Sequence, residues 1–187
     1  MLRNGSKSTK SRFHIFKTAP TGTLLIADSQ ARHLKEGNLN IISLPGAGVR
    51  HVYNFIPPKN EFDLIILFIG GNDLFDDTEP SDTPAPQIAN ELIELANFLS
   101  ERAKQVFVLG IPERDRNKER VEEVNKILEK LAKRVPRITP KVAWKFRSVS
   151  TYISGLRYYE KDKIHLNSRR VEQLEELHQR TNSVQKV

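Results

Sequence analysis

The sequence predicts an α/β protein: a three-layer sandwich in which a mainly parallel, five-stranded sheet lies between layers of helices. Two observations carry this prediction. Short apolar runs of strand length recur along the chain, and segments with helical periodicity lie between several of them. Parallel strands need long crossover connections, which are usually helices, so this alternation indicates parallel rather than antiparallel strands.

Four apolar runs have the length and composition of strands that are buried on both faces of a sheet. A fifth segment has a weaker pattern of the same kind. We therefore expect strands at residues 23–27, 39–44, 63–69, 105–111 and 141–146.

Two segments place apolar residues on one stripe at helical spacing. In residues 87–102 the stripe consists of Ile88, Leu92, Leu95, Ala96 and Leu99. In residues 117–134 it consists of Val121, Val124, Ile127, Leu128 and Leu131. A last helix is expected to begin near Asn167 or Ser168, either of which can cap it, with Val171, Leu174 and Leu177 as its buried stripe.

The composition fits one domain. The chain has 187 residues, of which 38% are hydrophobic, enough for a single core. We expect a basic, flexible N-terminal arm at residues 1–18, a domain at 19–181 and a short tail at 182–187. The sequence contains no cysteine, which excludes disulfides, a thiolate nucleophile and cysteine-ligated zinc.

The charge is unevenly distributed in this basic protein. The formal net charge is +7, yet residues 21–100 hold 4 Lys and Arg against 11 Asp and Glu. A basic tail is more often a solvated arm than a nucleic-acid contact, and both interpretations stay open here. Neither a signal peptide nor a membrane span is recognisable, so we expect an intracellular location, cytoplasmic or nuclear, although a mature secreted form would look the same.

The candidate functional residues follow the expected strands. Ser29 follows the first strand, Gly46 the second and residues 70–73 the third, while Asp162 and His165 lie after the last. Because ligand sites of parallel sheets lie at the carboxyl ends of the strands, we expect these segments to meet at one edge.

Each of these residues alone has a simpler interpretation. A serine after a strand is most often a helix N-cap, and Asn72 with Asp73 can form a local Asx turn. The residues at 162–165 can be an ordinary loop. Their occurrence together, as a hydroxyl, a carboxamide and an imidazole spaced from a carboxylate, favours an esterase.

The four segments resemble the sequence blocks of the SGNH (GDSL-type) hydrolases. The blocks are Ala27-Asp28-Ser29, Pro45-Gly46-Ala47-Gly48, Gly70-Gly71-Asn72-Asp73 and Asp162 to Leu166. Ala27 departs from the pattern, since the family usually has glycine there. Within the family, residues 45–51 and 68–75 look most similar to esterase domains of first-reading-frame proteins of some non-LTR retrotransposons.

The resemblance implies a flavodoxin-like SGNH hydrolase fold and a serine esterase that cleaves a small acyl ester through an acyl-enzyme. Ser29 would be the nucleophile, His165 the base and Asp162 the residue that orients it. The oxyanion hole would consist of the Ser29 and Gly46 N–H groups and the Asn72 side chain. Gly48 is the alternative to Gly46. No cofactor or metal is required.

The alternative function is an SGNH-like binding module whose basic termini hold nucleic acid or a protein partner. The remaining histidines, His14, His33, His51 and His178, lack the spacing of metal ligands and are expected on the surface or in packing. The acidic run of Asp76, Asp77, Glu79 and Asp82 is interpreted as a solvated loop. Tyr152, Tyr158 and Tyr159 beside Arg157 are expected to line the pocket or pack.

Overall fold

The computed structural model describes residues 14–15, 22–29, 40–56, 62–74, 83–112, 118–133 and 144–147. The strands in this part are β1 (His14–Ile15), β2 (Thr23–Ala27), β3 (Asn40–Ser43), β4 (Phe62–Phe68), β5 (Ala103–Leu109) and β6 (Trp144–Arg147). The helices are the 3-10 helix η2 (Val49–Phe55) and the α-helices α1 (Ala85–Ser100) and α2 (Lys118–Ala132).

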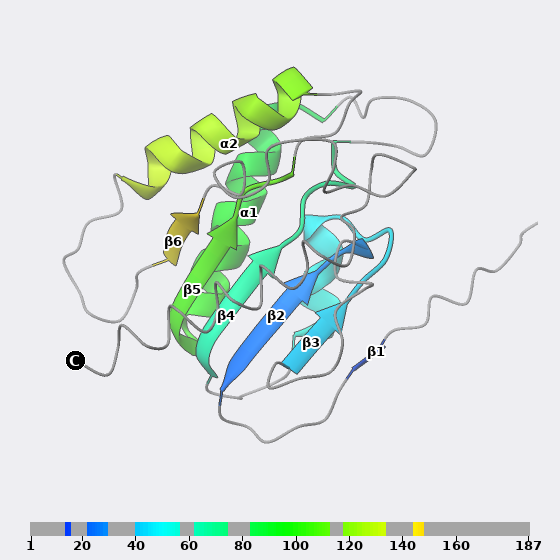
Figure 1. Cartoon of the computed structure of the whole chain (residues 1–187), viewed down its shortest axis with the longest axis vertical. Coiled ribbons are helices and arrows are strands. Elements are labelled where there is room, and N and C mark those ends of the chain that lie inside the picture. Colours follow the sequence, from blue (N-terminus) through cyan, green and yellow to red (C-terminus); the bar gives the residue numbers. More distant parts are fainter. Residues whose placement is uncertain are drawn as a thin grey trace, which may run out of the picture.

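The strands form one sheet in the order β1-β3-β2-β4-β5-β6, and every pair from β3 to β6 is parallel (Figure 1). The prediction of a mainly parallel α/β sheet is thus confirmed. The five parallel strands follow the spatial order 2-1-3-4-5, which is the flavodoxin-like order. The chain reverses direction across the sheet beside β2, and ligand sites of such sheets lie at this reversal.

The sheet has one strand more than the sequence predicted. His14 and Ile15, in the segment assigned to the N-terminal arm, form β1 and pair antiparallel with Ser43 and Ile42 of β3. A strand of two residues has no hydrophobic period of its own, so only pairing with β3 reveals it.

The positions of the strands in the sheet explain their composition. All five residues of β2 are buried, and β2 lies in the interior of the sheet, between β3 and β4. This is the environment that a continuous apolar run predicts.

The helix α1 begins two residues before the expected start. Pro84 is the N-cap of this helix, and Pro86 lies in its first turn. Proline is tolerated there, because the first N–H groups of a helix have no intrahelical partner to lose.

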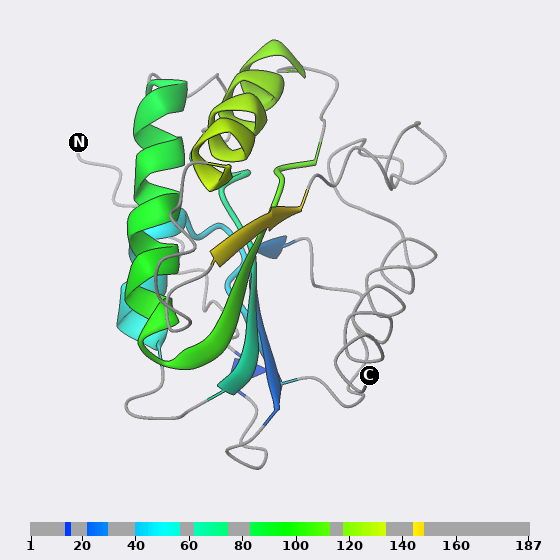
Figure 2. The same ribbon diagram turned by 90° about the vertical axis from the view of Figure 1, so that its left-hand side faces the viewer.

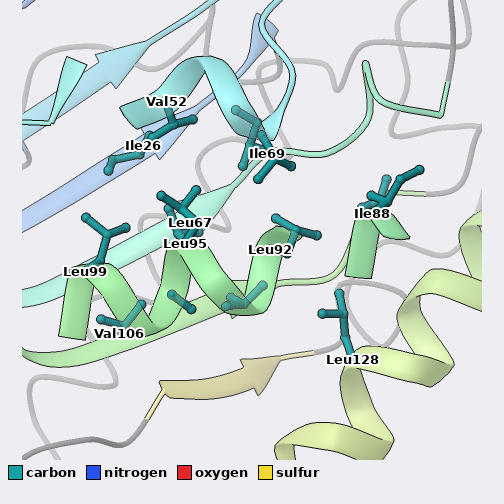
Figure 3. Close-up of a cluster of buried hydrophobic side chains, with 14 of the residues drawn as sticks. Ile26, Val52, Leu67, Ile69, Ile88, Leu92, Leu95, Leu99, Val106 and Leu128 are labelled. Atoms are coloured by element: carbon teal, nitrogen blue, oxygen red, sulfur yellow. The ribbon is translucent and has the colours of Figure 1, made fainter. Parts of the chain in front are cut away.

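The hydrophobic core fills the space between the sheet and the described helices. Figure 2 shows η2, α1 and α2 on the same face of the sheet. In Figure 3 Leu92, Leu95 and Leu99 of α1 point toward the strands, and each is fully buried. Val52 of η2 and Leu128 of α2 extend this cluster at either end. The expected stripe of α1 is therefore buried in the core, whereas Ile127 and Leu131 of the expected α2 stripe are only partly buried against it.

The helix expected from residue 167 or 168 lies outside the described residues. Among the helices that the structure describes, none has the length and apolar character needed to cross a membrane.

Candidate active site

The three parallel strands at the reversal of the sheet end level with one another. Ala27, the last residue of β2, pairs with Ser43 on one side and with Phe68 on the other. The pairing continues one step further, since the Leu44 N–H donates to the Ala27 carbonyl at 2.8 Å and the Asp28 N–H to the Phe68 carbonyl at 3.3 Å. The segments that begin at Asp28, Leu44 and Ile69 therefore leave the sheet side by side, as the sequence predicts.

Ser29 is the second residue after β2. We call the residues that follow β2, β3 and β4 the β2, β3 and β4 segments. Asp28 is 1% exposed, whereas Ser29 is half-buried, so the chain rises from the core to the surface between the two residues. The Ser43 hydroxyl lies 3.5 Å from the Asp28 carbonyl oxygen. Ala27 is fully buried, and the sheet accommodates its methyl group where the resemblance would place glycine.

The two glycines of the β3 segment have different environments. Gly46 is exposed and has a φ of +77°, a conformation that L-residues rarely adopt, with open space where a side chain would begin. The N–H of Gly48 donates to Nδ1 of His51 at 3.2 Å, within the first turn of η2. Since the Gly48 amide has this acceptor, Gly46 is the better candidate for an exposed donor.

The β4 segment turns sharply before Asn72. Gly70 has a φ of +113°, and a Cβ atom there would lie only 3.0 Å from Cδ1 of Ile111. The side chain of Asn125 in α2 fixes the main chain of Ile111, accepting from its N–H and donating to its carbonyl, both at 2.9 Å. Gly70 is thus required both by its backbone conformation and by the packing of Ile111.

Asn72 and Asp73 bind the β3 segment and its continuation into η2. The Asn72 Nδ2 atom donates to the Ala47 carbonyl at 3.0 Å, and both Asp73 oxygens lie 3.1 Å from the Val49 nitrogen. These partners are 24 and 25 residues away along the chain, so a local Asx turn does not account for either side chain. Neither role of Asp73 and Ala47 is evident from the sequence, although both residues lie in the four blocks.

The environment of Asp73 perturbs its acidity. Burial raises the pKa of this carboxyl group above its ordinary value, and the Glu91 carboxylate of α1 adds to the effect. The Val49 N–H and His51 act in the opposite direction. The Val49 N–H and His51 therefore offset only part of the cost of burying the charged Asp73 carboxylate.

The expected base and its orienting carboxylate, His165 and Asp162, lie outside the described residues, as do the acidic run at 76–82 and the tyrosines at 152, 158 and 159. The structure therefore brings Ser29, Gly46 and Asn72 to one edge of the sheet and does not test the remaining two residues. In the ranges that it describes, no group of three or more His, Asp or Glu side chains is arranged to hold a metal ion.

No protein-family model matches the sequence, and no curated protein is similar to it at a significant level. Solved structures are similar in fold. A mutant of an acetyl esterase with acetate ion has a TM-score of 0.63 and is 13% identical, over 88% of this chain and 99% of that one. A lipase/acylhydrolase from Enterococcus faecalis has a TM-score of 0.60 at 18% identity, over 86% and 94%.

A GDSL-like lipase from Bacteroides thetaiotaomicron gives a TM-score of 0.65 at 14% identity, over 87% of each chain. Identities this low establish the fold alone. The chain therefore has the α/β fold of the SGNH and GDSL-type acylhydrolases, with Ser29, Gly46 and Asn72 on segments that leave the sheet at the edge where such sheets bind ligands.

Proposed function

We propose that this protein is a serine esterase of the SGNH type that hydrolyses a small acyl ester. The observation that carries the proposal is the convergence of Ser29, Gly46 and Asn72 from three parallel strands that end level with one another. The similar folds of an acetyl esterase and two lipases or acylhydrolases support the same reaction class.

The proposed oxyanion hole has donors of the right kind. Asn72 has a carboxamide with two hydrogens, one of which binds the Ala47 carbonyl and so fixes the plane of the group. Gly46 is exposed, and the space where its Cβ atom would lie is open. Donors held in advance stabilise the charge that develops on the attacked carbonyl without reorganisation during the reaction.

The reaction would proceed in two steps. His165 takes the proton of the Ser29 hydroxyl, the Ser29 oxygen attacks the ester carbonyl, and the leaving alcohol receives the proton as the acyl-enzyme forms. Water then attacks the acyl group with His165 again as base, which releases the acid and restores Ser29. Asp162 would hold the imidazole in the required tautomer. These roles of Asp162 and His165 rest on the sequence resemblance.

Labelling with a fluorophosphonate probe tests the proposal without knowledge of the substrate. We expect the parent protein to be labelled and to hydrolyse p-nitrophenyl acetate, and both signals to disappear in Ser29→Ala and His165→Ala. Ser100→Ala is the matched control, because Ser100 ends α1 near the start of β5, at the opposite edge of the sheet, where its hydroxyl donates to Asn97. Equal signals in the parent and in Ser29→Ala would refute the proposal.

A binding module is the second candidate, and the positive charge outside residues 21–100 favours it. In this proposal the chain is related to the retrotransposon esterase domains, and its basic termini hold RNA, DNA or a protein partner. Removal of residues 1–12, which leaves β1 intact, should then abolish salt-dependent binding of a generic oligonucleotide. Binding that persists after this deletion would exclude the N-terminal residues as the site.

A further inference from the structure

We propose that Asp73 is a positioning residue of the oxyanion hole, which holds the loop of the Gly46 donor in register with Asn72. The inference rests on the proposed esterase function and assigns a role to a residue outside the triad and the oxyanion donors. It is carried by a pair of contacts between the β4 and β3 segments and by the space around Gly48.

The two contacts form a clamp, which we define as Asn72 to Ala47 and Asp73 to Val49. Asn72 donates to the carbonyl of Ala47, and Asp73 accepts from the N–H of Val49. Adjacent residues of one segment thus bind the main chain on either side of Gly48. Two contacts of opposite polarity fix both the distance and the rotation of one segment against the other, which a single bond does not.

Gly48 lies between the two contacts of this clamp, and its lack of a side chain allows the Asp73 carboxylate to come close. A Cβ atom at Gly48 would lie 2.4 Å from Oδ1 of Asp73 and 3.1 Å from its Cγ. Any side chain at this position would therefore push the carboxylate away from Val49. The absence of a side chain at Gly48 permits this approach, and the role differs from that of Gly46, which is required by its backbone conformation.

The clamp is electrostatically expensive. Asp73 is partly desolvated, and it faces Glu91 from α1 as well as His51 from η2, while Arg50 neutralises Glu91 through an ion pair of 2.7 Å. Asparagine has nearly the same shape and could accept from Val49 without a buried charge. A partly buried carboxylate with such a cost fits a role in geometry better than a role in stability.

The test compares Asp73→Ala, Asp73→Asn and Gly48→Ala with the parent, using p-nitrophenyl acetate as the substrate. We expect the kcat of Asp73→Ala and of Gly48→Ala to fall by about 10- to 100-fold with KM nearly unchanged, because oxyanion donors act mainly in the transition state. Asp73→Asn should lose less, since it keeps an acceptor of the same reach. Its melting temperature should not fall.

Asp63→Asn is the matched control, because Asp63 is exposed in β4 near the opposite edge of the sheet and pairs with Lys104. Its kcat should equal that of the parent. The double variant Gly48→Ala with Asp73→Ala should be little worse than either single variant, because both changes break the same contact. Additive losses would contradict the clamp.

Two results separate this inference from the proposed function. If the parent hydrolyses the ester and Asp73→Ala retains its kcat, the inference is overturned and the esterase stands. If the parent is inactive, the esterase proposal fails. Nuclear magnetic resonance then tests whether the contact between Asp73 and Val49 exists, without any need for activity. The Val49 amide resonance should then shift with the titration of a carboxyl group in the parent and not in Asp73→Asn, and an unchanged titration in the variant would overturn the contact.

Discussion

The side-chain nitrogen of Asn72 lies 3.0 Å from the main-chain carbonyl oxygen of Ala47, and this contact joins the segments that follow β4 and β3. A carboxamide with one hydrogen engaged in this way cannot rotate freely, so its second hydrogen has a fixed direction. The same contact brings Asn72 next to the loop that contains Gly46. The two expected oxyanion donors are therefore parts of one connected unit.

The first prediction concerns Asn72. Asn72→Ala removes a donor and releases Ala47, so we expect kcat to fall by about 10²- to 10³-fold, the range for loss of one oxyanion donor. The measurement is the hydrolysis of p-nitrophenyl acetate. Asn90→Ala, at an exposed position of α1, should be indistinguishable from the parent. A kcat of Asn72→Ala close to that of the parent would exclude the side chain from the oxyanion hole.

The second prediction concerns the backbone at Gly46. Its φ of +77° is unfavourable for residues with a Cβ atom, so Gly46→Ala should lower the free energy of unfolding by about 1–2 kcal/mol. Because space is open there, strain and not a clash causes the loss. Asparagine tolerates positive φ better than alanine, so Gly46→Asn should lose less. Urea denaturation compares the two variants, and equal losses would contradict this explanation.

The third prediction concerns Asn125, which fixes the main chain of Ile111, the residue that packs beside Gly70. Asn125→Ala removes two hydrogen bonds to the main chain of Ile111, each worth about 0.5–1.5 kcal/mol, so the free energy of unfolding should fall by about 1–3 kcal/mol. Asn97→Ala, at an exposed position of α1, should change it little. Asn125→Asp should be no better than alanine, since its carboxylate would face the Ile111 carbonyl. Stability of Asn125→Ala equal to the parent's would refute this role.

The fourth prediction is a pH dependence. Burial raises the pKa of Asp73 above 3.8, so the folded protein retains a proton at pH values where the unfolded chain has lost it. The contribution of Asp73 to stability is therefore greatest at low pH and declines as pH rises through this window. Relative to the parent, Asp73→Asn should become more stable as pH rises from 3.8 and then level off. Denaturation at several pH values measures this, with Asp63→Asn as control; a difference that does not vary with pH would refute it.

Local patterns determined most of the secondary structure. The run at 23–27 predicts β2 at its observed bounds, because a central strand must be apolar on both faces. The stripe of α1 is buried as expected, and in the α2 stripe Val121, Val124 and Leu128 are buried while the other two residues are partly buried. The start of α1 was misjudged, because proline breaks a helix interior but is tolerated in its first turn.

The candidate site was predicted in part. The parallel direction of the strands follows from their alternation with helices, and the positions of Ser29, Gly46 and Asn72 follow from the rule for parallel sheets. The clamp was not foreseen, because its contacts join residues 24 and 25 positions apart. The roles of Asp162 and His165 stay predictions from the sequence.

The sequence alone determined which residues can carry the chemistry and which strands and helices present them, because periodicity and residue type act over short distances. Only the tertiary structure decided that β1 joins the sheet, that Gly48 is packed against Asp73, and that Asn72 is fixed by Ala47. These features depend on contacts between segments remote in the chain. Such contacts leave no periodic pattern in either segment, since each supplies only half of the interaction.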